Sequence, residues 1–165
     1  MALRKSHIAI LSLRGISLLF LLISFVILIN NGNYYKKAGL KNYFVGLGTY
    51  SYMFGATIIG IGYTVLQIIV FVIFQIIMKS DKYIVFEFYG DKAISYLLLS
   101  AAAAGIGASR ELKPRLTDKD KNVDLYNNFN NYLSKGSAAA SLLLPAFVCT
   151  AILSILSSYA LSKKI

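Results

Sequence analysis

Charged residues are missing from four long stretches of the chain. These stretches contain 21, 37, 17 and 27 residues and lie between Arg14 and Lys36, Lys41 and Lys79, Lys92 and Arg110, and Lys135 and Lys163. A helix that crosses the hydrocarbon core of a bilayer, about 30 Å thick, needs about 20 mostly apolar residues. The pattern therefore predicts four membrane-crossing helices and an integral membrane protein.

The predicted helices cover about residues 8–30, 51–78, 85–109 and 136–161. Outer loops at 31–50 and 110–135 and a tight inner turn at 79–84 join them, which leaves no room for a soluble domain. We therefore predict an all-α fold, a single four-helix transmembrane bundle over residues 1–165. An even number of crossings puts both termini on the same side of the membrane.

The second outer loop contains apolar residues at three- and four-residue spacings. They are Val123, Tyr126, Phe129, Tyr132 and Leu133. This spacing is typical of a short amphipathic helix that lies on the membrane surface. An ordinary loop with scattered aromatic residues is the alternative, and the spacing alone does not separate the two.

Composition supports a membrane protein and argues against catalysis. Hydrophobic residues make up 57% of the chain and charged residues 15%, whereas a soluble domain carries about 25% charged residues. A single cysteine, Cys149, excludes an intramolecular disulfide and a thiol-based metal site. Because we find no phosphate-binding loop and no nucleophile–base arrangement, we predict a protein that is not an enzyme and uses no cofactor or metal.

The net charge of +10 raises the question of a nucleic-acid partner. The basic residues are spread over segments on both membrane faces, so membrane lipids or a polar partner fit better than nucleic acid. Outside the predicted helices, six Lys and Arg residues lie on the side of the termini and nine on the other side. The positive-inside rule therefore leans mildly against cytoplasmic termini, although the terminal side is the denser one per residue, and charge alone does not decide the orientation.

Two opposite charges lie at matching depths in helices that run in the same direction. Arg14 and Asp91 are each six residues inside their predicted helices, or about 9 Å along the axis. Charges inside a membrane span are costly and usually paired, so we predict an intramembrane pair between them. The alternative is that both are interfacial, with Arg14 reaching the headgroups and Asp91 at a helix N-terminus, where an anion is favoured. Glu87 is placed at the rim.

Small residues four apart mark faces where helices can approach closely in lipid. Such pairs are Ala56 and Gly60 in the second predicted helix and Ala101 and Gly105 in the third. They could pack helices within one bundle or join copies of the chain. We predict that some of them form a contact between copies in a homo-oligomer.

Three segments of the chain carry a family resemblance: "SLRGISLLFLLISFVILINN", "IGYTVLQ" and "GDKAISYLLLSAAAA". Together they resemble the Casparian strip membrane domain proteins of plants and their CASP-like relatives. The resemblance covers nearly the whole chain and implies a fold related to the MARVEL four-helix architecture, with cytoplasmic termini. It also implies that Arg14 and Asp91 are the hallmark charges of the family.

The resemblance further implies a plasma-membrane scaffold that associates with itself and with other CASP-like proteins and organises cell-wall modifying partners. One feature departs from the family. Many members carry a cysteine pair in the second outer loop, and here Tyr126 and Leu133 stand about where these cysteines are expected. The outer-face role of the strip-forming members is therefore not carried over.

A small oligomeric channel or transporter is the alternative function. A pore needs polar groups along one path, and Gln67 and Gln75, eight residues apart in the second predicted helix, would share a face. Few other polar residues lie deep in the helices, so the sequence favours the scaffold.

Overall fold

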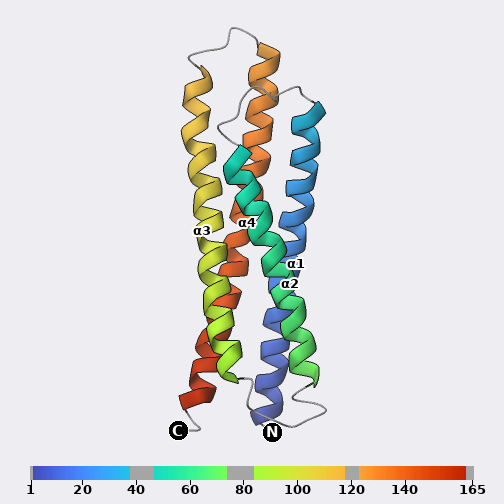
Figure 1. Cartoon of the computed structure of the whole chain (residues 1–165), viewed down its shortest axis with the longest axis vertical. Helices are drawn as coiled ribbons and strands as arrows, with labels where there is room; N and C mark the ends of the chain where they lie inside the picture. The colour runs from blue at the N-terminus through green and yellow to red at the C-terminus, as the bar shows by residue number, and fades with distance from the viewer. Residues whose placement is uncertain (1, 38–46, 74–83, 118–122, 163–165) are drawn as a thin grey trace.

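The computed structural model describes residues 2–37, 47–73, 84–117 and 123–162 of the chain. Four helices account for nearly all of them: α1 (Ala2–Lys37), α2 (Leu47–Phe71), α3 (Ile84–Thr117) and α4 (Val123–Ser162) (Figure 1). Within these ranges no strand occurs. This confirms the prediction of an all-α, four-helix fold.

The helices form an elongated antiparallel bundle. The start of α1 and the end of α4 lie at the same end of the bundle (Figure 1). The helix α4 packs extensively along α3 and α1, while α2 packs against α3 and α1 and barely touches α4. The helices α1 and α3 are therefore diagonal partners that run in the same direction. A side chain that links them must cross the interior.

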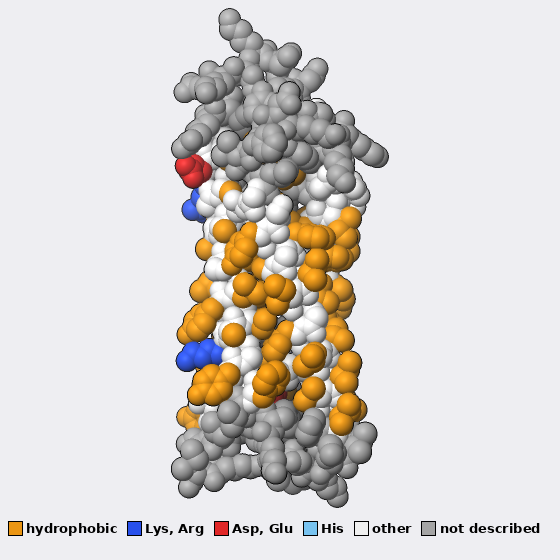
Figure 2. Space-filling view, in the orientation of Figure 1, with side chains coloured by type: hydrophobic (Ala, Val, Ile, Leu, Met, Phe, Trp, Pro, Cys, Tyr) orange, Lys and Arg blue, Asp and Glu red, His pale blue; other side chains and the backbone are white. Residues whose placement is uncertain are grey.

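The helices are long enough and apolar enough to cross a membrane. The candidate spans are Ile8–Asn33, Gly48–Val70, Phe86–Leu112 and Asn127–Tyr159. Large apolar side chains on the outside of the bundle are exposed, for example Leu19 at 61% and Ile155 at 58%, and Figure 2 shows them as a broad hydrophobic band. A surface this apolar is rare on soluble monomers but suits the lipid interior. The chain is therefore a multi-pass membrane protein.

Three helices continue beyond the lengths predicted from the sequence. The helix α4 has 40 residues, which corresponds to about 60 Å at about 1.5 Å per residue, twice the thickness of the hydrocarbon core. The helices α1 and α3 have 36 and 34 residues. Of the predicted second helix, residues 74–78 lie outside the described residues, as does most of the predicted turn 79–84.

The prediction of an outer loop over 110–135 was wrong. The helix α3 continues to Thr117, and α4 already begins at Val123. The apolar spacing after residue 123 does mark a helix, but this helix is the first part of α4 and not a separate element on the membrane surface. Phe129, Tyr132 and Leu133 are buried in the bundle. Charged residues end a membrane span, but they do not end a helix, because a helix can continue into water.

Apolar side chains fill the interior of the bundle along its axis. Leu21, Met53, Leu98 and Leu143, one from each helix, are all fully buried. Polar side chains in the upper half, away from the termini, make hydrogen bonds between helices. Ser24 Oγ donates to the Ala139 carbonyl at 3.1 Å, and the Tyr50 and Ser109 hydroxyls lie 2.8 Å apart. At the end near the termini, a charged cluster takes the place of this apolar packing.

Candidate functional site

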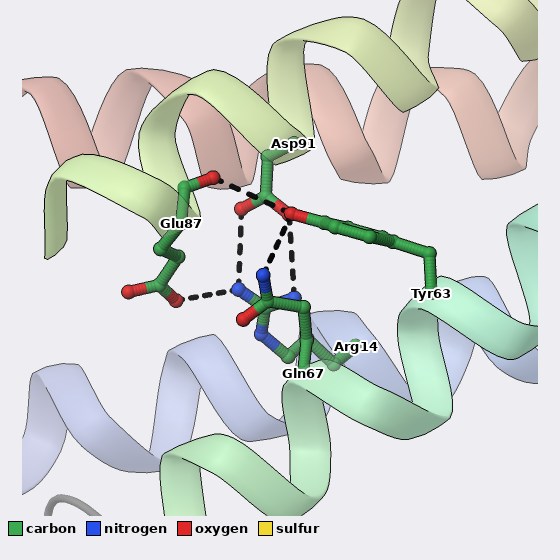
Figure 3. A network of polar contacts seen from close by, with 5 residues as sticks. All are labelled: Arg14, Tyr63, Gln67, Glu87 and Asp91. Atoms are coloured by element: carbon green, nitrogen blue, oxygen red, sulfur yellow. Dashed lines mark hydrogen bonds and ion pairs between the residues drawn. The ribbon is translucent and has the colours of Figure 1, made fainter. Parts of the chain in front are cut away.

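The charged cluster joins α1 to α3. Arg14 projects from α1, and Glu87 and Asp91 project from α3 (Figure 3). Arg14 Nη1 and Nη2 donate to the two carboxylate oxygens of Asp91 at 3.3 and 3.1 Å. Arg14 Nη2 also donates to Glu87 Oε1 at 2.5 Å. Residues four apart on a helix share a face, so both carboxylates of α3 point at the same guanidinium.

All three charged side chains are removed from the surroundings of the bundle. Arg14 is 1% exposed, Asp91 0% and Glu87 5%. Charges that are taken out of water are tolerated only when they are paired in good geometry. The fork-to-fork contact between Arg14 and Asp91 is of this kind. The cluster therefore links the diagonal helices α1 and α3 through the interior.

The helix α2 adds two polar side chains to the cluster. Tyr63 donates its hydroxyl to Asp91 Oδ1 at 2.8 Å, and Gln67 Nε2 donates to the Tyr63 hydroxyl oxygen at 2.8 Å. On α3, a side chain at Gly90 would overlap the Tyr63 ring. Glycine at this position therefore makes room for Tyr63 to reach Asp91.

The cluster is not balanced in charge or in hydrogen bonds. One guanidinium faces two carboxyl groups, which gives a formal charge of −1 if both are ionised. Arg14 Nε and Gln67 Oε1 are buried without a hydrogen-bond partner. Within the described ranges, no three side chains of the His, Cys, Asp and Glu types gather to hold a metal. The arrangement is suited to fixing three helices against one another.

The structure brings together the two charged residues that the sequence singled out, Arg14 and Asp91. Sequence reasoning missed the other three members of the cluster, Glu87, Tyr63 and Gln67, and considered Gln67 only as a possible pore lining. Glu87 was placed at the rim, although its position four residues before Asp91 already puts it on the same face. Tyr63 was noted only as part of a segment resemblance, since nothing in the order of residues shows that α2 turns this side chain toward α3.

The four predicted small residues all lie inside the bundle of one chain. Ala56 and Ala101 are 2% and 0% exposed, and Gly60 and Gly105 are buried. A Cβ added at Gly60 would lie 3.3 Å from a methyl group of Leu98, and one at Gly105 would lie 2.9 Å from Ala140 Cβ.

The structure places these four residues in contacts within one chain. A contact between copies through them stays a prediction. Their small size is already used within the chain, where it lets α2, α3 and α4 approach one another.

Comparison with known proteins identifies the family. Residues 3–149 match the Casparian strip membrane protein domain, and this match includes the whole charged cluster. The chain belongs to this family. The sequence-based resemblance to CASP-like proteins is thereby confirmed.

Several CASP-like proteins of plants are similar to this chain over most of their length. CASP-like protein 4D1 of Ricinus communis is 39% identical, with 97% of this chain and 95% of the relative covered. CASP-like protein 4D2 of Arabidopsis thaliana is 37% identical, with 95% of this chain and 91% of the relative covered. CASP-like protein 4B1 of Arabidopsis thaliana is 30% identical, with 90% and 70% covered. No solved structure matches the chain.

One of the two positions at which the resemblance implied a cysteine lies in the interior of the bundle. Leu133 lies on α4 and is fully buried. Its carbonyl accepts a hydrogen bond of 3.4 Å from Ser109 Oγ on α3. The side chain of Tyr126, the other expected cysteine position, lies outside the described residues. Leu133 is therefore part of the buried core, and its carbonyl is linked to α3 by this hydrogen bond.

Proposed function

We propose that the protein is a non-enzymatic scaffold of the plant plasma membrane that assembles with itself and with other CASP-like proteins. In this proposal the assembly organises partners that modify the cell wall. The match of residues 3–149 to the Casparian strip membrane protein domain carries the proposal. The buried cluster supports it, because Arg14, Glu87 and Asp91 hold one another and stiffen the bundle as a building block.

The packing of polar side chains favours the scaffold over a channel within one chain. Gln67, the best candidate for a pore lining, is fully buried and bonded to Tyr63. Thr57 and Thr64 donate to carbonyls of their own helix, those of Met53 and Gly60, both at 2.7 Å. The two threonine hydroxyls are therefore bonded within α2, and Gln67 is directed at Tyr63 of the charged cluster, so these side chains do not line a shared path. Gln75, the second pore candidate, lies outside the described residues.

The outer face of α2 is the surface we propose for contacts between copies. Gly48, Gly55 and Gly62 recur every seven residues, which is close to two helical turns, so they share one side of α2. Apart from the adjoining backbone of α2, a Cβ added at any of them would meet nothing within 4 Å. Small residues on a lipid-facing helix allow a second helix to approach closely. This face, unlike Gly60 and its neighbours, is open to another copy.

Single-molecule bleaching tests the self-association. We expect the protein fused to a fluorescent protein, at densities too low for chance overlap, to bleach in several steps per spot in plant plasma membrane. A fusion of an unrelated monomeric four-span protein at the same density serves as the control and should bleach in one step. One step per spot for our protein at every density would contradict the scaffold.

We also propose that the termini face the cytoplasm. The support is the family resemblance, because the counts of basic residues on the two sides do not decide the orientation. The start of α1 and the end of α4 lie together (Figure 1), so one tag reports on both. An epitope tag on the N-terminus should resist external protease and antibody in intact protoplasts and become accessible after permeabilisation. Labelling of this tag on intact protoplasts would show that the termini face the outside of the cell.

A further inference from the structure

Lys92 is an exposed cation inside a membrane span. It lies six residues after the start of the span Phe86–Leu112, or about 9 Å along the helix axis. The acidic groups nearest in sequence, Glu87 and Asp91, are buried in the interior and bound to Arg14. Lys92 Nζ lies 5.8 Å from the centroid of the Phe88 ring on the outer surface of α3. An ammonium group at this depth attracts an anion from the surrounding lipid.

A pocket beside Lys92 gives such an anion a defined place. It has a volume of about 350 Å³ and lies between α3 and α4, lined by Phe88, Lys92, Ser154, Ile155, Ser158 and Tyr159. Tyr159 is the last residue of the α4 span, so the pocket lies where hydrocarbon meets headgroups, at the end of the bundle that carries the termini.

The lining matches the two parts of a phospholipid. Lys92 offers an ammonium group and Ser158 offers a hydroxyl donor, and both groups bind phosphate oxygens. Ile155 lies four residues inside the end of the α4 span, so it offers apolar surface on the side of the pocket where an acyl chain enters the hydrocarbon. A headgroup with its own ammonium would be repelled by Lys92, so an anionic headgroup is favoured over a zwitterionic one.

We propose that this pocket between α3 and α4 binds an anionic phospholipid, with the headgroup phosphate between the Lys92 ammonium and the Ser158 hydroxyl and an acyl chain that runs past Ile155 toward the middle of the membrane span. The site lies on the outer surface and does not involve the buried Arg14 cluster. It would bind lipid whether or not the protein self-associates, so the site and the scaffold are tested separately.

The chain contains no tryptophan, which allows a single reporter to be placed in the pocket. In Tyr159→Trp, the new indole lies in the pocket wall, and phospholipids with brominated acyl chains quench it on contact. In phosphatidylcholine vesicles with increasing brominated phosphatidylglycerol, we expect a preference of about fivefold for the anionic lipid, as one lysine near a membrane surface contributes about 1 kcal/mol.

Two further variants serve as controls. Adding Lys92→Gln to Tyr159→Trp should abolish the preference while leaving contact with phosphatidylcholine unchanged. Ile16→Trp places the reporter on the outer surface of α1, near the depth of Asp91, since Ile16 is two residues from Arg14. It should show no preference, because it contacts ordinary surrounding lipid. Circular dichroism checks that all variants keep their helices.

Two results would overturn the proposal: equal quenching by both lipids in Tyr159→Trp, or a preference that survives Lys92→Gln.

Adding excess inorganic phosphate shows whether the pocket binds a lipid headgroup or a free phosphate ion. It should leave the quenching unchanged, and loss of quenching would assign the site to phosphate alone. If Tyr159→Trp fails to fold, native mass spectrometry of the unaltered chain replaces it. Bound phosphatidylglycerol should then survive on the unaltered chain and be lost from Lys92→Gln.

Discussion

Arg14→Leu is expected to destabilise the protein severely. It removes the guanidinium that pairs with Glu87 and Asp91, and both carboxyl groups remain buried. Breaking a buried ion pair by removing one partner costs about 3–5 kcal/mol. This is a large part of the marginal stability of a folded domain, about 5–15 kcal/mol. We expect loss of a monodisperse detergent-solubilised species and a strongly lowered thermal transition, with little protein exported from the endoplasmic reticulum.

Combined substitutions separate a three-membered cluster from a simple pair. If only Arg14 and Asp91 interacted, the double change Arg14→Leu/Asp91→Leu would recover most of the stability. The structure adds Glu87, which this double variant leaves buried without a cation. We therefore expect the double variant to recover little. The triple variant, which also carries Glu87→Leu, should recover most of the lost stability, because apolar residues can replace a complete buried ion group without loss.

Glu87→Gln is the matched control with a small effect. Its amide oxygen can still accept the hydrogen bond from Arg14 Nη2, and the formal charge of the cluster changes from −1 to zero. We expect its thermal transition to stay close to that of the unaltered protein. Substitution effects that are all mild and simply additive would contradict the cluster, since uncoupled sites behave in this way. They would show that water or headgroups solvate each charge separately.

The sequence predicts the number of helices and their membrane spans well, because lipid imposes a strong rule. Backbone groups in hydrocarbon must bond within a helix, and charges must stay out. Four charge-free stretches therefore become four helices. The helix ends are not predicted, because that rule no longer applies beyond the hydrocarbon core. The helix α3 continues to Thr117 and α4 already begins at Val123, beyond the stretches on which this rule acts.

The charged cluster is predicted only in part, for a similar reason. The sequence shows how deep each charged residue lies along its helix, and Arg14 and Asp91 lie at the same depth in helices that run in the same direction. The rotation of α2 about its axis is not readable, so the contribution of Tyr63 appears only in the structure. Small residues pose the same problem. Glycine and alanine show that something approaches closely, but they do not show whether it belongs to the same chain or to another copy.

A pair of glycine variants decides which small residues serve the bundle and which serve the assembly. Gly105→Leu places a large side chain where even a Cβ would lie 2.9 Å from Ala140 Cβ and closer still to Met53 Sδ. Overpacking of this kind costs about 1–3 kcal/mol and occasionally more, and three added carbons beyond the Cβ put this variant at the upper end. We expect a clearly lowered thermal transition.

Gly62→Leu makes the same change on the outer face of α2, where a Cβ meets nothing within 4 Å apart from the adjoining backbone of α2. Its thermal transition should stay unchanged, because leucine there lies in lipid and is a better helix former than glycine. Its number of bleaching steps should fall, because the larger side chain keeps a second copy away. An unchanged number of bleaching steps would show that this face of α2 does not form the contact between copies. Unchanged stability in Gly105→Leu would show that α2, α3 and α4 do not pack as closely as the structure places them.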